Sequence, residues 1–296
     1  MLRGRPIDIT LRVDTLLNEL PPVSLSIAEF DPFGQSGTIS DLKTFAAHNC
    51  YGVAAVTTLV LSHAGTKHRL HPTASQWLKE TLFSLFKEHE VRAVKVGMVS
   101  GRAHVEAICE VLDAYRSIPV VVDPDLRGMD APAGKETAGA DVLRSLLVGR
   151  ATVVTPNAME AAALTGLPVQ SPTEMKTAAA KLVEFGARSA VVAGGVFEKP
   201  FDIYFDREVS ETLAGERFKV EAPYGPGSTF SSAIAANLAL GRQPHDAVVM
   251  AKAFVTEALR KGYITPAGTV LLNHLYRTQQ MPRIIETEPA TSERSS

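Results

Sequence analysis

Residues 91–124, VRAVKVGMVSGRAHVEAICEVLDAYRSIPVVVDP, carry the clearest fold signal in the chain. Two valine-rich runs, residues 93–96 and 119–122, enclose a segment at 103–115 whose apolar side chains recur at helical spacing. A strand, a helix and another strand in succession are typical of a parallel sheet, because the helix provides the crossover between the two strands. Strands that are apolar without interruption further indicate that helices cover both faces of the sheet.

The same alternation extends in both directions from this segment. Further strands are expected at residues 23–28, 53–61, 152–154 and 190–192. Helices are expected at about 40–47, 75–87, 138–147, 158–164, 172–185, 227–239 and 245–261. Two short strands at 203–205 and 218–220 predict an antiparallel edge. The sequence therefore predicts an α/β fold with a mostly parallel central sheet and helices on both faces.

Apolar segments recur evenly, so we expect one domain over residues 23–273. Residues 1–22 form an N-terminal extension, with a short amphipathic helix expected at 13–20 before Pro21 and Pro22. Residues 274–296 are expected to form a flexible C-terminal tail, because the chain from residue 281 is rich in Glu, Pro, Ser and Thr.

Composition excludes several classes of function. The net charge of -2 provides no electrostatic footprint for nucleic acid. No apolar run approaches the roughly 20 residues that span a bilayer, and the charged N-terminus does not resemble a signal peptide. Cys50 and Cys109 lie far apart, which argues against a disulfide framework or a C-x-x-C site. We expect a soluble protein of the reducing cytoplasm.

The loop Tyr224-Gly225-Pro226-Gly227-Ser228 precedes a segment of small residues that is expected to be helical. Glycines at the start of a helix allow backbone N–H groups to converge on an anion, such as a phosphate. Two glycines are a weak motif, however, and Pro226 has no N–H to donate. A plain turn in which Ser228 or Thr229 caps the helix is the alternative.

Asn157 and Glu160 follow a strand and are three residues apart at an expected helix start. An amide and a carboxylate in this arrangement can hold a magnesium ion through water, as phosphoryl transfer requires. The same pair can form a capping box, with Asn157 as the N-cap. The two roles are compatible.

Other polar or backbone-exposing residues also follow strands. Asp31 and Asp123 each end a strand, Gly97 and Met98 follow residues 94–96, and Gly194-Gly195 follows residues 190–193. A single aspartate at a strand end is often only a turn former. Together, however, these residues predict a pocket, because ligands of such folds bind outside the carboxyl ends of the strands.

These segments, taken in order, resemble the hydroxymethylpyrimidine/phosphomethylpyrimidine kinases, a branch of the ribokinase-like superfamily. The resemblance covers roughly residues 23–262, and an ordered series of motifs is more specific than any single one. The matching motifs are Asp41-Leu42-Lys43-Thr44-Phe45, Tyr51-Gly52, Lys95-Val96-Gly97-Met98, Val122-Asp123-Pro124, Thr155-Pro156-Asn157 with Glu160-Ala161, Thr229-Phe230-Ser231 with residues 233–238, and Ala251-Lys252 with residues 255–258.

The resemblance implies a ribokinase-like three-layer sandwich and a homodimer. It also implies phosphorylation of 4-amino-5-hydroxymethyl-2-methylpyrimidine, and then of its monophosphate, with ATP and magnesium. The implied catalytic residues are Gly225, Gly227 and Ser228. The residues implied to bind ATP are Asn157, Glu160, Gly194, Gly195 and Thr229, with Glu160 also holding magnesium through water. The residues implied to surround the pyrimidine are Asp31, Gly34, Ser62, Met98 and Asp123.

The chain departs from the family pattern at several of these positions. Two small residues after the first strand are replaced by Glu29 and Phe30, and Phe33 adds bulk nearby. Ser62 stands where the family has the glutamine that recognises the pyrimidine, and Ala193 stands where it has a phosphate-binding lysine.

The glycine loop departs as well, since Pro226 and Ser228 replace residues of a G-T-G-C loop whose cysteine occupies the position of the catalytic base. An alcohol is a much weaker base than a thiolate and needs an activating partner. We therefore expect a kinase with reduced turnover or an altered substrate. The alternatives are a catalytically impaired binding or regulatory homologue, and a pyridoxal or sugar kinase.

Overall fold

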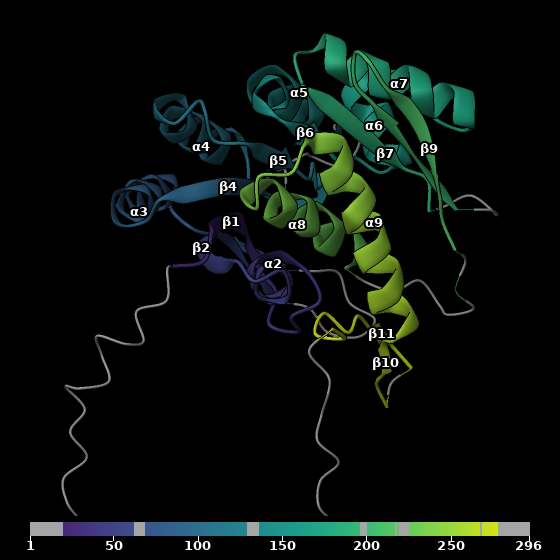
Figure 1. The fold of residues 1–296 in the computed structure, drawn as a ribbon. Helices are drawn as coiled ribbons and strands as arrows, with labels where there is room; N and C mark the ends of the chain where they lie inside the picture. Colours follow the sequence, from purple (N-terminus) through teal and green to yellow (C-terminus); the bar gives the residue numbers. More distant parts are fainter. Residues whose placement is uncertain are drawn as a thin grey trace, which may run out of the picture.

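In the part of the chain that the structure describes, a nine-stranded sheet forms the middle layer (Figure 1). The computed structural model describes residues 20–61, 69–128, 136–195, 200–216, 218, 225–266 and 268–277. The strands, in their order across the sheet, are β3 (Arg69–Pro72), β2 (Tyr51–Leu61), β1 (Val23–Phe30), β4 (Val91–Val96), β5 (Val120–Val122), β6 (Val153–Val154), β7 (Ser189–Ala193), β8 (Phe201–Phe205) and β9 (Ser210–Ala214).

The central strands β2, β1, β4, β5, β6 and β7 are all parallel to their neighbours. In this register Ser26 of β1 lies opposite Lys95 of β4, which in turn lies opposite Val121 of β5. β3 pairs antiparallel with β2, and β8 and β9 form an antiparallel edge beyond β7. Because the central strands share one direction, the loops at their carboxyl ends meet along one side of the sheet.

Helices cover both faces of the sheet (Figure 1). One face carries α2 (Gly37–Ala47), α8 (Pro226–Ala239) and α9 (Pro244–Arg260). The other carries α3 (Ser75–Glu88), α4 (Arg102–Ala114), α5 (Glu136–Leu146), α6 (Ala158–Thr165) and α7 (Pro172–Glu184). Short 3-10 turns at Leu126–Gly128 and Val148–Arg150 lie between β5 and α5 and between α5 and β6.

The strand residues alternate between the two helical layers. Ala93 and Val121 pack in the core with α8 and α9, whereas Val94 and Val120 pack in the core on the opposite face. All four are buried. The continuous valine runs of the sequence therefore mark strands that are covered on both faces.

The prediction of a mostly parallel sheet between helical layers is confirmed, as is the antiparallel edge. The position of the second edge strand was wrong: β9 is Ser210–Ala214, while Phe218 is not in a strand and residues 219–220 lie outside the described residues. In β9 only Leu213 is buried, so this strand shows no apolar run. The strands β3, β10 (Tyr263–Ile264) and β11 (Val270–Leu271) were not predicted; all three are short, and β3 and β10 are largely exposed.

The terminal segments are described only in part. The helix expected at residues 13–20 lies outside the described residues except for Leu20, and so do residues 278–296 of the expected tail. His274, by contrast, is buried against the domain. Among the described helices, none is long and apolar enough to cross a membrane.

Candidate active site

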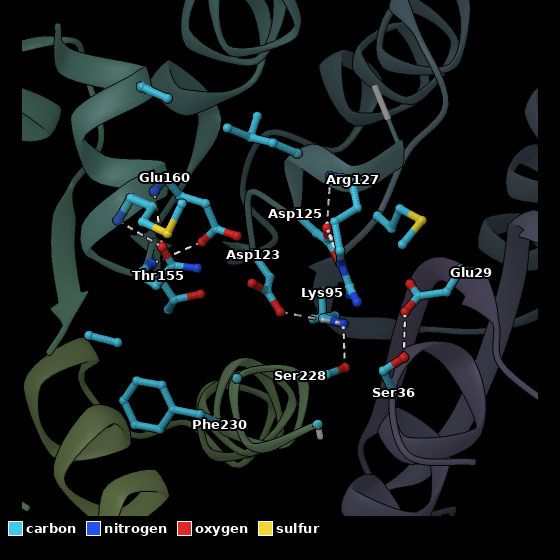
Figure 2. A pocket seen from close by; sticks show the side chains of 18 residues that line it. Glu29, Ser36, Lys95, Asp123, Asp125, Arg127, Thr155, Glu160, Ser228 and Phe230 are labelled. Carbon is cyan, nitrogen blue, oxygen red and sulfur yellow. Dashed lines mark hydrogen bonds and ion pairs between the residues drawn. The ribbon is translucent and has the colours of Figure 1, made fainter. Parts of the chain in front are cut away.

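A cavity of about 590 Å³ lies at the carboxyl ends of the parallel strands (Figure 2). The ends of β1, β4, β5, β6 and β7 and the first turn of α8 contribute its walls. The residues singled out from the sequence that line it are Met98, Asp123, Asn157, Glu160, Gly225, Gly227 and Ser228. A pocket at this edge of the sheet is therefore confirmed.

Lys95 of β4 lies at the centre of the cavity wall, with its side chain 1% exposed. Its ammonium group donates to both carboxylate oxygens of Asp41, at 3.0 and 3.1 Å, and to the Ser228 hydroxyl at 3.1 Å. Burial acts to lower the pKa of Lys95, but the carboxylates of Asp41, Asp123 and Glu29 outweigh burial and raise it. The lysine is therefore a permanent positive charge in the cavity.

Asp41 of α2 supplies the negative charge that balances Lys95, and it is fully buried. Its carboxylate also accepts hydrogen bonds from the hydroxyls of Ser26, Ser228 and Ser232. A buried ion pair is tolerated when additional hydrogen bonds satisfy both partners in this way. The pair therefore fixes the position of the Ser228 hydroxyl, which donates to Asp41 at 3.0 Å and accepts from Lys95.

The first turn of α8 faces the cavity because of its glycine loop. Gly225 is the N-cap with a φ of 97°, and a Cβ atom at this position would lie 1.8 Å from the backbone oxygen of Gln35. Both the dihedral angle and the close approach therefore require glycine. Pro226 occupies the first helical position, where a missing N–H is tolerated.

The next N–H groups, from Gly227 and Ser228, belong to the first turn and have no acceptor within the helix. Both residues line the cavity. Their N–H groups and the helix dipole together favour an anion at this point.

The alternative in which Ser228 or Thr229 caps α8 is wrong, because Gly225 is the N-cap and no side chain caps the helix. Thr229, implied to bind ATP, is fully buried instead. Its hydroxyl bonds to the Ser40 hydroxyl at 3.2 Å and to Nε2 of His274 at 3.1 Å. Its side chain therefore packs between α2 and α8 rather than facing the cavity.

Asn157 and Glu160 form the capping box that was considered from the sequence. Asn157 is the N-cap of α6 and accepts from the N–H groups of Met159 and Glu160, while the Glu160 carboxylate accepts from the Asn157 N–H at 2.9 Å. Both side chains also line the cavity. Burial, with a further contribution from Asp123, raises the pKa of Glu160 to about 8.

Two more carboxylates, those of Asp123 and Asp125, line the cavity together with Lys95 and Glu160. Asp123 accepts from the Ser231 hydroxyl at 2.9 Å and lies 3.9 Å from the Lys95 ammonium. Burial raises the pKa of Asp123, and neighbouring Asp125 raises it further while Lys95 opposes both. Asp125 forms an ion pair with Arg127. This side of the cavity therefore holds more acidic groups than basic ones.

A second cavity of about 440 Å³ adjoins the first. Gly195, Asp202 and Thr256 are among the residues that line it. Ala193, Gly227 and Phe230 line both cavities. The two spaces therefore meet at the first turns of α8, next to Ser228.

The structure does not bring Asp31 and Gly34 into either cavity. The Asp31 carboxylate accepts from the backbone N–H groups of Phe33, Gln35 and Ser36, at 3.0 to 3.1 Å, and so it organises the loop after β1. Gly34 lines a separate cavity of about 270 Å³ near His274.

The remaining predicted residues have different placements. The Gly194 N–H donates to the Phe201 carbonyl at 2.9 Å, which ties β7 to β8. Gly195 lines only the second cavity. Ser62 lies outside the described residues.

Sequence reasoning missed Glu29, Asp41, Lys95 and Arg127 as site residues. Lys95 and Asp41 belong to motifs that carry the family resemblance. A further signal was available for both: a lysine inside a valine-rich strand and an aspartate on an apolar helix face indicate a buried ion pair. In the sequence Glu29 stands out only as a departure from the family pattern, and nothing in the local sequence distinguishes Arg127 from a surface arginine.

The residues of the cavity fit a hydrated magnesium ion. Carboxylate oxygens are its preferred protein ligands, and the raised pKa of Glu160 reflects a site in which a cation would be favourable. Among the described residues, no group of three or more His, Cys, Asp or Glu side chains could hold a metal ion alone. A magnesium ion bound through one carboxylate, water and phosphate oxygens does not need such a group.

Comparison with known proteins identifies relatives that span most of the chain. Hydroxymethylpyrimidine/phosphomethylpyrimidine kinase of Staphylococcus aureus (strain MSSA476) is 33% identical over 258 residues, which cover 86% of this chain and 94% of the relative. An ADP complex of Bacillus subtilis pyridoxal kinase has a TM-score of 0.82 at 30% identity, and 88% of this chain and 99% of that one are covered.

Pyridoxal kinase from Staphylococcus aureus, in complex with AMP-PCP and pyridoxal, has a TM-score of 0.79 at 30% identity, with 88% and 96% coverage. The expected ribokinase-like architecture is confirmed by these structural neighbours. The family model for phosphomethylpyrimidine kinase matches residues 31–272. The chain belongs to the phosphomethylpyrimidine kinase family.

Proposed function

We propose that this chain transfers a phosphoryl group from ATP to the hydroxymethyl group of 4-amino-5-hydroxymethyl-2-methylpyrimidine or of its monophosphate. The observation that carries this proposal is the buried Lys95–Asp41 pair, which holds the Ser228 hydroxyl at the N-terminus of α8, where the two cavities meet. A cation, backbone N–H groups without an acceptor in the helix and a helix N-terminus in one place suit the charge that a transferring phosphoryl group carries.

We assign ATP to the second cavity and the alcohol to the first. The second cavity reaches from Gly195 to Thr256 and opens toward the phosphate-favouring end of α8 at Gly227. The structural neighbours support this assignment in general terms, since one is a complex with ADP and another a complex with AMP-PCP and pyridoxal.

ATP with magnesium supplies the phosphoryl group and part of the charge neutralisation. The Lys95 ammonium and the N–H groups of Gly227 and Ser228 stabilise the negative charge of the group in transit. The Ser228 hydroxyl, with its donor and one lone pair committed to Asp41 and Lys95, has a remaining lone pair for the hydrogen of the substrate alcohol. The groups that hold the Ser228 hydroxyl in place thereby orient the substrate alcohol for phosphoryl transfer.

We also assign magnesium to the carboxylate side of the first cavity. Glu160 holds the ion through water, and the Asn157 N–H fixes one oxygen of the Glu160 carboxylate. The acidic groups Asp123 and Glu160 both have raised pKa values mainly because of burial, so a divalent cation stabilises their ionised forms.

Turnover is expected to be lower than in family members with a cysteine at position 228. An alcohol is a weaker base than a thiolate. The chain also has Ala193 where the family has a phosphate-binding lysine, and Pro226 removes one loop N–H. Positioning and charge neutralisation nevertheless account for most catalysis of phosphoryl transfer, so these changes reduce turnover without abolishing it.

Two alternatives have specific support. A pyridoxal-type kinase is favoured by the likeness to pyridoxal kinase structures. A catalytically impaired binding or regulatory homologue is favoured by Ser228 and Ala193. We also expect a homodimer in the cytoplasm from the family resemblance, and light scattering after size-exclusion chromatography tests the oligomeric state.

A coupled assay of ADP release tests the proposed function. The purified protein is incubated with ATP, magnesium and, in turn, the hydroxymethylpyrimidine, its monophosphate and pyridoxal. We expect the largest kcat/KM with one of the two pyrimidines. Higher kcat/KM with pyridoxal supports the first alternative. ADP release no faster than without an alcohol, together with thermal stabilisation by the pyrimidine, supports a binding protein and contradicts our proposal.

The double variant Ser228→Cys, Ala193→Lys tests the expected reduction in turnover. We expect its kcat to exceed that of the wild type, because both changes restore groups of the family pattern. A decrease in kcat, in a variant with unchanged thermal stability, would show that Ser228 is not a weakened substitute.

A further inference from the structure

Glu29 is a buried carboxylate on the wall of the first cavity (Figure 2). It is the second-last residue of β1 and is 3% exposed. The Ser36 hydroxyl donates to its Oε1 at 2.8 Å, and this is the only side-chain partner of the carboxylate among the described residues. The carboxylate thus retains most of its capacity to accept hydrogen bonds.

The other acidic side chains that line this cavity have firm partners. Asp125 forms an ion pair with Arg127, Asp123 accepts from Ser231, and Glu160 accepts from a backbone N–H. Glu160 is also the residue that we assign to magnesium. Among the described residues, Glu29 forms no ion pair of the kind that Asp125 forms with Arg127 and Asp123 with Lys95.

The positive charge of Lys95 does not neutralise Glu29 directly. Lys95 contributes to its electrostatic environment, but the ammonium group forms its hydrogen bonds with Asp41 and Ser228. Burial raises the pKa of Glu29, and Asp125 and Asp41 raise it further, whereas Lys95 and Ser36 act in the opposite direction. The protein alone therefore stabilises the ionised carboxylate incompletely, and a donor on a ligand would complete it.

The backbone around Glu29 holds the carboxylate in place. Gly37 packs so closely that a Cβ atom there would lie 2.1 Å from the Glu29 carbonyl oxygen and less than 3 Å from its side chain. Gly37 has a φ of 60°, which also favours glycine. Ser36, bonded to Glu29, is itself anchored through its N–H to Asp31. A carboxylate fixed on two sides is suited to recognition, because little side-chain freedom is lost when a ligand binds.

We propose that Glu29 determines the substrate specificity of this cavity by accepting a hydrogen bond from an N–H group on the ring of the alcohol. The ligand class is a heteroaromatic alcohol with an exocyclic amine or a protonated ring nitrogen. The inference rests on the proposed function only in placing an alcohol in the first cavity. The replacement of a small residue by Glu29 is then a gain of a recognition group.

Binding of two pyrimidines in the absence of ATP tests the role of Glu29. The probes are 4-amino-5-hydroxymethyl-2-methylpyrimidine and the same compound without its 4-amino group, and dissociation constants are measured by calorimetry. A hydrogen bond to a charged group corresponds to a preference of roughly 10- to 100-fold for the amino compound in the wild type. Glu29→Ala is expected to abolish this preference, and Glu29→Gln to reduce it to a few-fold, since an amide oxygen accepts a weaker bond.

Ser36→Ala is the matched control, because it removes the hydrogen bond to Glu29 but leaves the carboxylate. It is expected to retain a preference of at least about 10-fold. The proposal would be overturned if Glu29→Ala or Glu29→Gln preferred the amino compound as strongly as the wild type does. A wild type that binds both pyrimidines equally or binds neither would also overturn it.

The outcome separates this inference from the proposed function, because calorimetry requires no turnover. A Glu29-dependent preference without ADP release supports the recognition role and contradicts the kinase proposal. ADP release with a pyrimidine, but with the same amine preference in Glu29→Ala and the wild type, supports the kinase proposal and overturns the role of Glu29.

Discussion

At the scale of single residues, the chemistry of the site depends on how Ser228 is held. Its hydroxyl lies between a buried carboxylate and a buried ammonium group, both already satisfied by other bonds. Asp41 accepts hydrogen bonds from Ser232 as well as from Ser228, but only Ser228 lines the cavity. Comparing variants of these two serines therefore distinguishes the catalytic contribution of a hydrogen bond to Asp41 from its structural contribution.

Ser228→Ala is expected to lower kcat by about 10-fold with little change in the KM of either substrate, because the variant loses a group that orients the alcohol in the transition state. Ser232→Ala removes a comparable bond from the buried side of the network. We expect it to lower stability by about 1 kcal/mol and kcat by no more than about 3-fold. Steady-state kinetics and urea unfolding measure both effects. Equal losses of kcat in the two variants would contradict a catalytic position for Ser228.

Glu160 gives a prediction about pH. Its pKa of about 8 in the folded protein exceeds the ordinary value of 4.5, so between these pH values the folded state binds a proton that the unfolded chain has lost. The contribution of Glu160 to the free energy of unfolding is therefore fully present below about pH 4.5 and is lost as the pH rises through about 8. The variant Glu160→Gln can keep the capping box, and it should not lose this contribution to the free energy of unfolding as the pH rises.

Urea unfolding without magnesium or nucleotide, from pH 5 to pH 8.5, measures the effect. The stability of Glu160→Gln relative to the wild type is expected to increase across this range. Glu174→Gln is the control, because Glu174 occupies the equivalent position after Ser171 in α7 but does not line the cavity. The same trend in both variants would contradict the assignment of the raised pKa to the cavity.

At the scale of secondary-structure elements, the N-terminus of α8 brings the two cavities together. The helix begins at Pro226, after a glycine that both the backbone angle and the neighbouring Gln35 require. The order of elements could be predicted from the sequence because the parallel strands are apolar on both faces. The strand β9 could not be predicted from the sequence, because four of its five residues are exposed and its pairing with β8 is decided by the tertiary structure.

Gly225→Ala tests the requirement at the start of α8. Alanine at a φ of 97° is strained by roughly 1–2 kcal/mol, and its Cβ atom would also collide with the backbone of Gln35. We expect a larger loss of stability than in Gly241→Ala, where φ is 83° but no atom lies within 4 Å of the added Cβ. We also expect an increased KM for ATP only in Gly225→Ala. Equal losses of stability in the two variants, measured by urea unfolding, would contradict the close approach of Gly225 to the backbone of Gln35.

At the scale of the whole molecule, the parallel sheet places residues from distant parts of the sequence in one cavity. Asp41, Lys95 and Ser228 come from α2, β4 and α8, and they meet because the register places β1 next to β4 and α2 against α8. From the sequence we could predict that the cavity lies at the carboxyl edge of the sheet. Seven of its lining residues could also be predicted, because they follow strands or open a helix.

The sequence could not predict the side-chain network of the same cavity. Lys95 lies within a strand and Asp41 within a helix, so neither shows the strand-end position that marked the other residues. Thr229 shows the opposite limitation. The family resemblance implied that it contacts ATP, yet the turn of the helix directs its hydroxyl toward Ser40. Which side of a helix faces a ligand is decided by packing against the neighbouring layer.

The central claim is that the Lys95-Asp41-Ser228 network supports phosphoryl transfer from ATP to the hydroxymethylpyrimidine. Mass spectrometry of the pyrimidine after incubation with ATP and magnesium tests it most directly, with the wild type and a folded Lys95→Met variant compared at equal concentration. We predict that the wild type adds one phosphate group per ADP formed and that Lys95→Met forms product at least about 100-fold more slowly. Unmodified pyrimidine in a wild-type sample that binds it, or equal rates in the two proteins, would contradict this account.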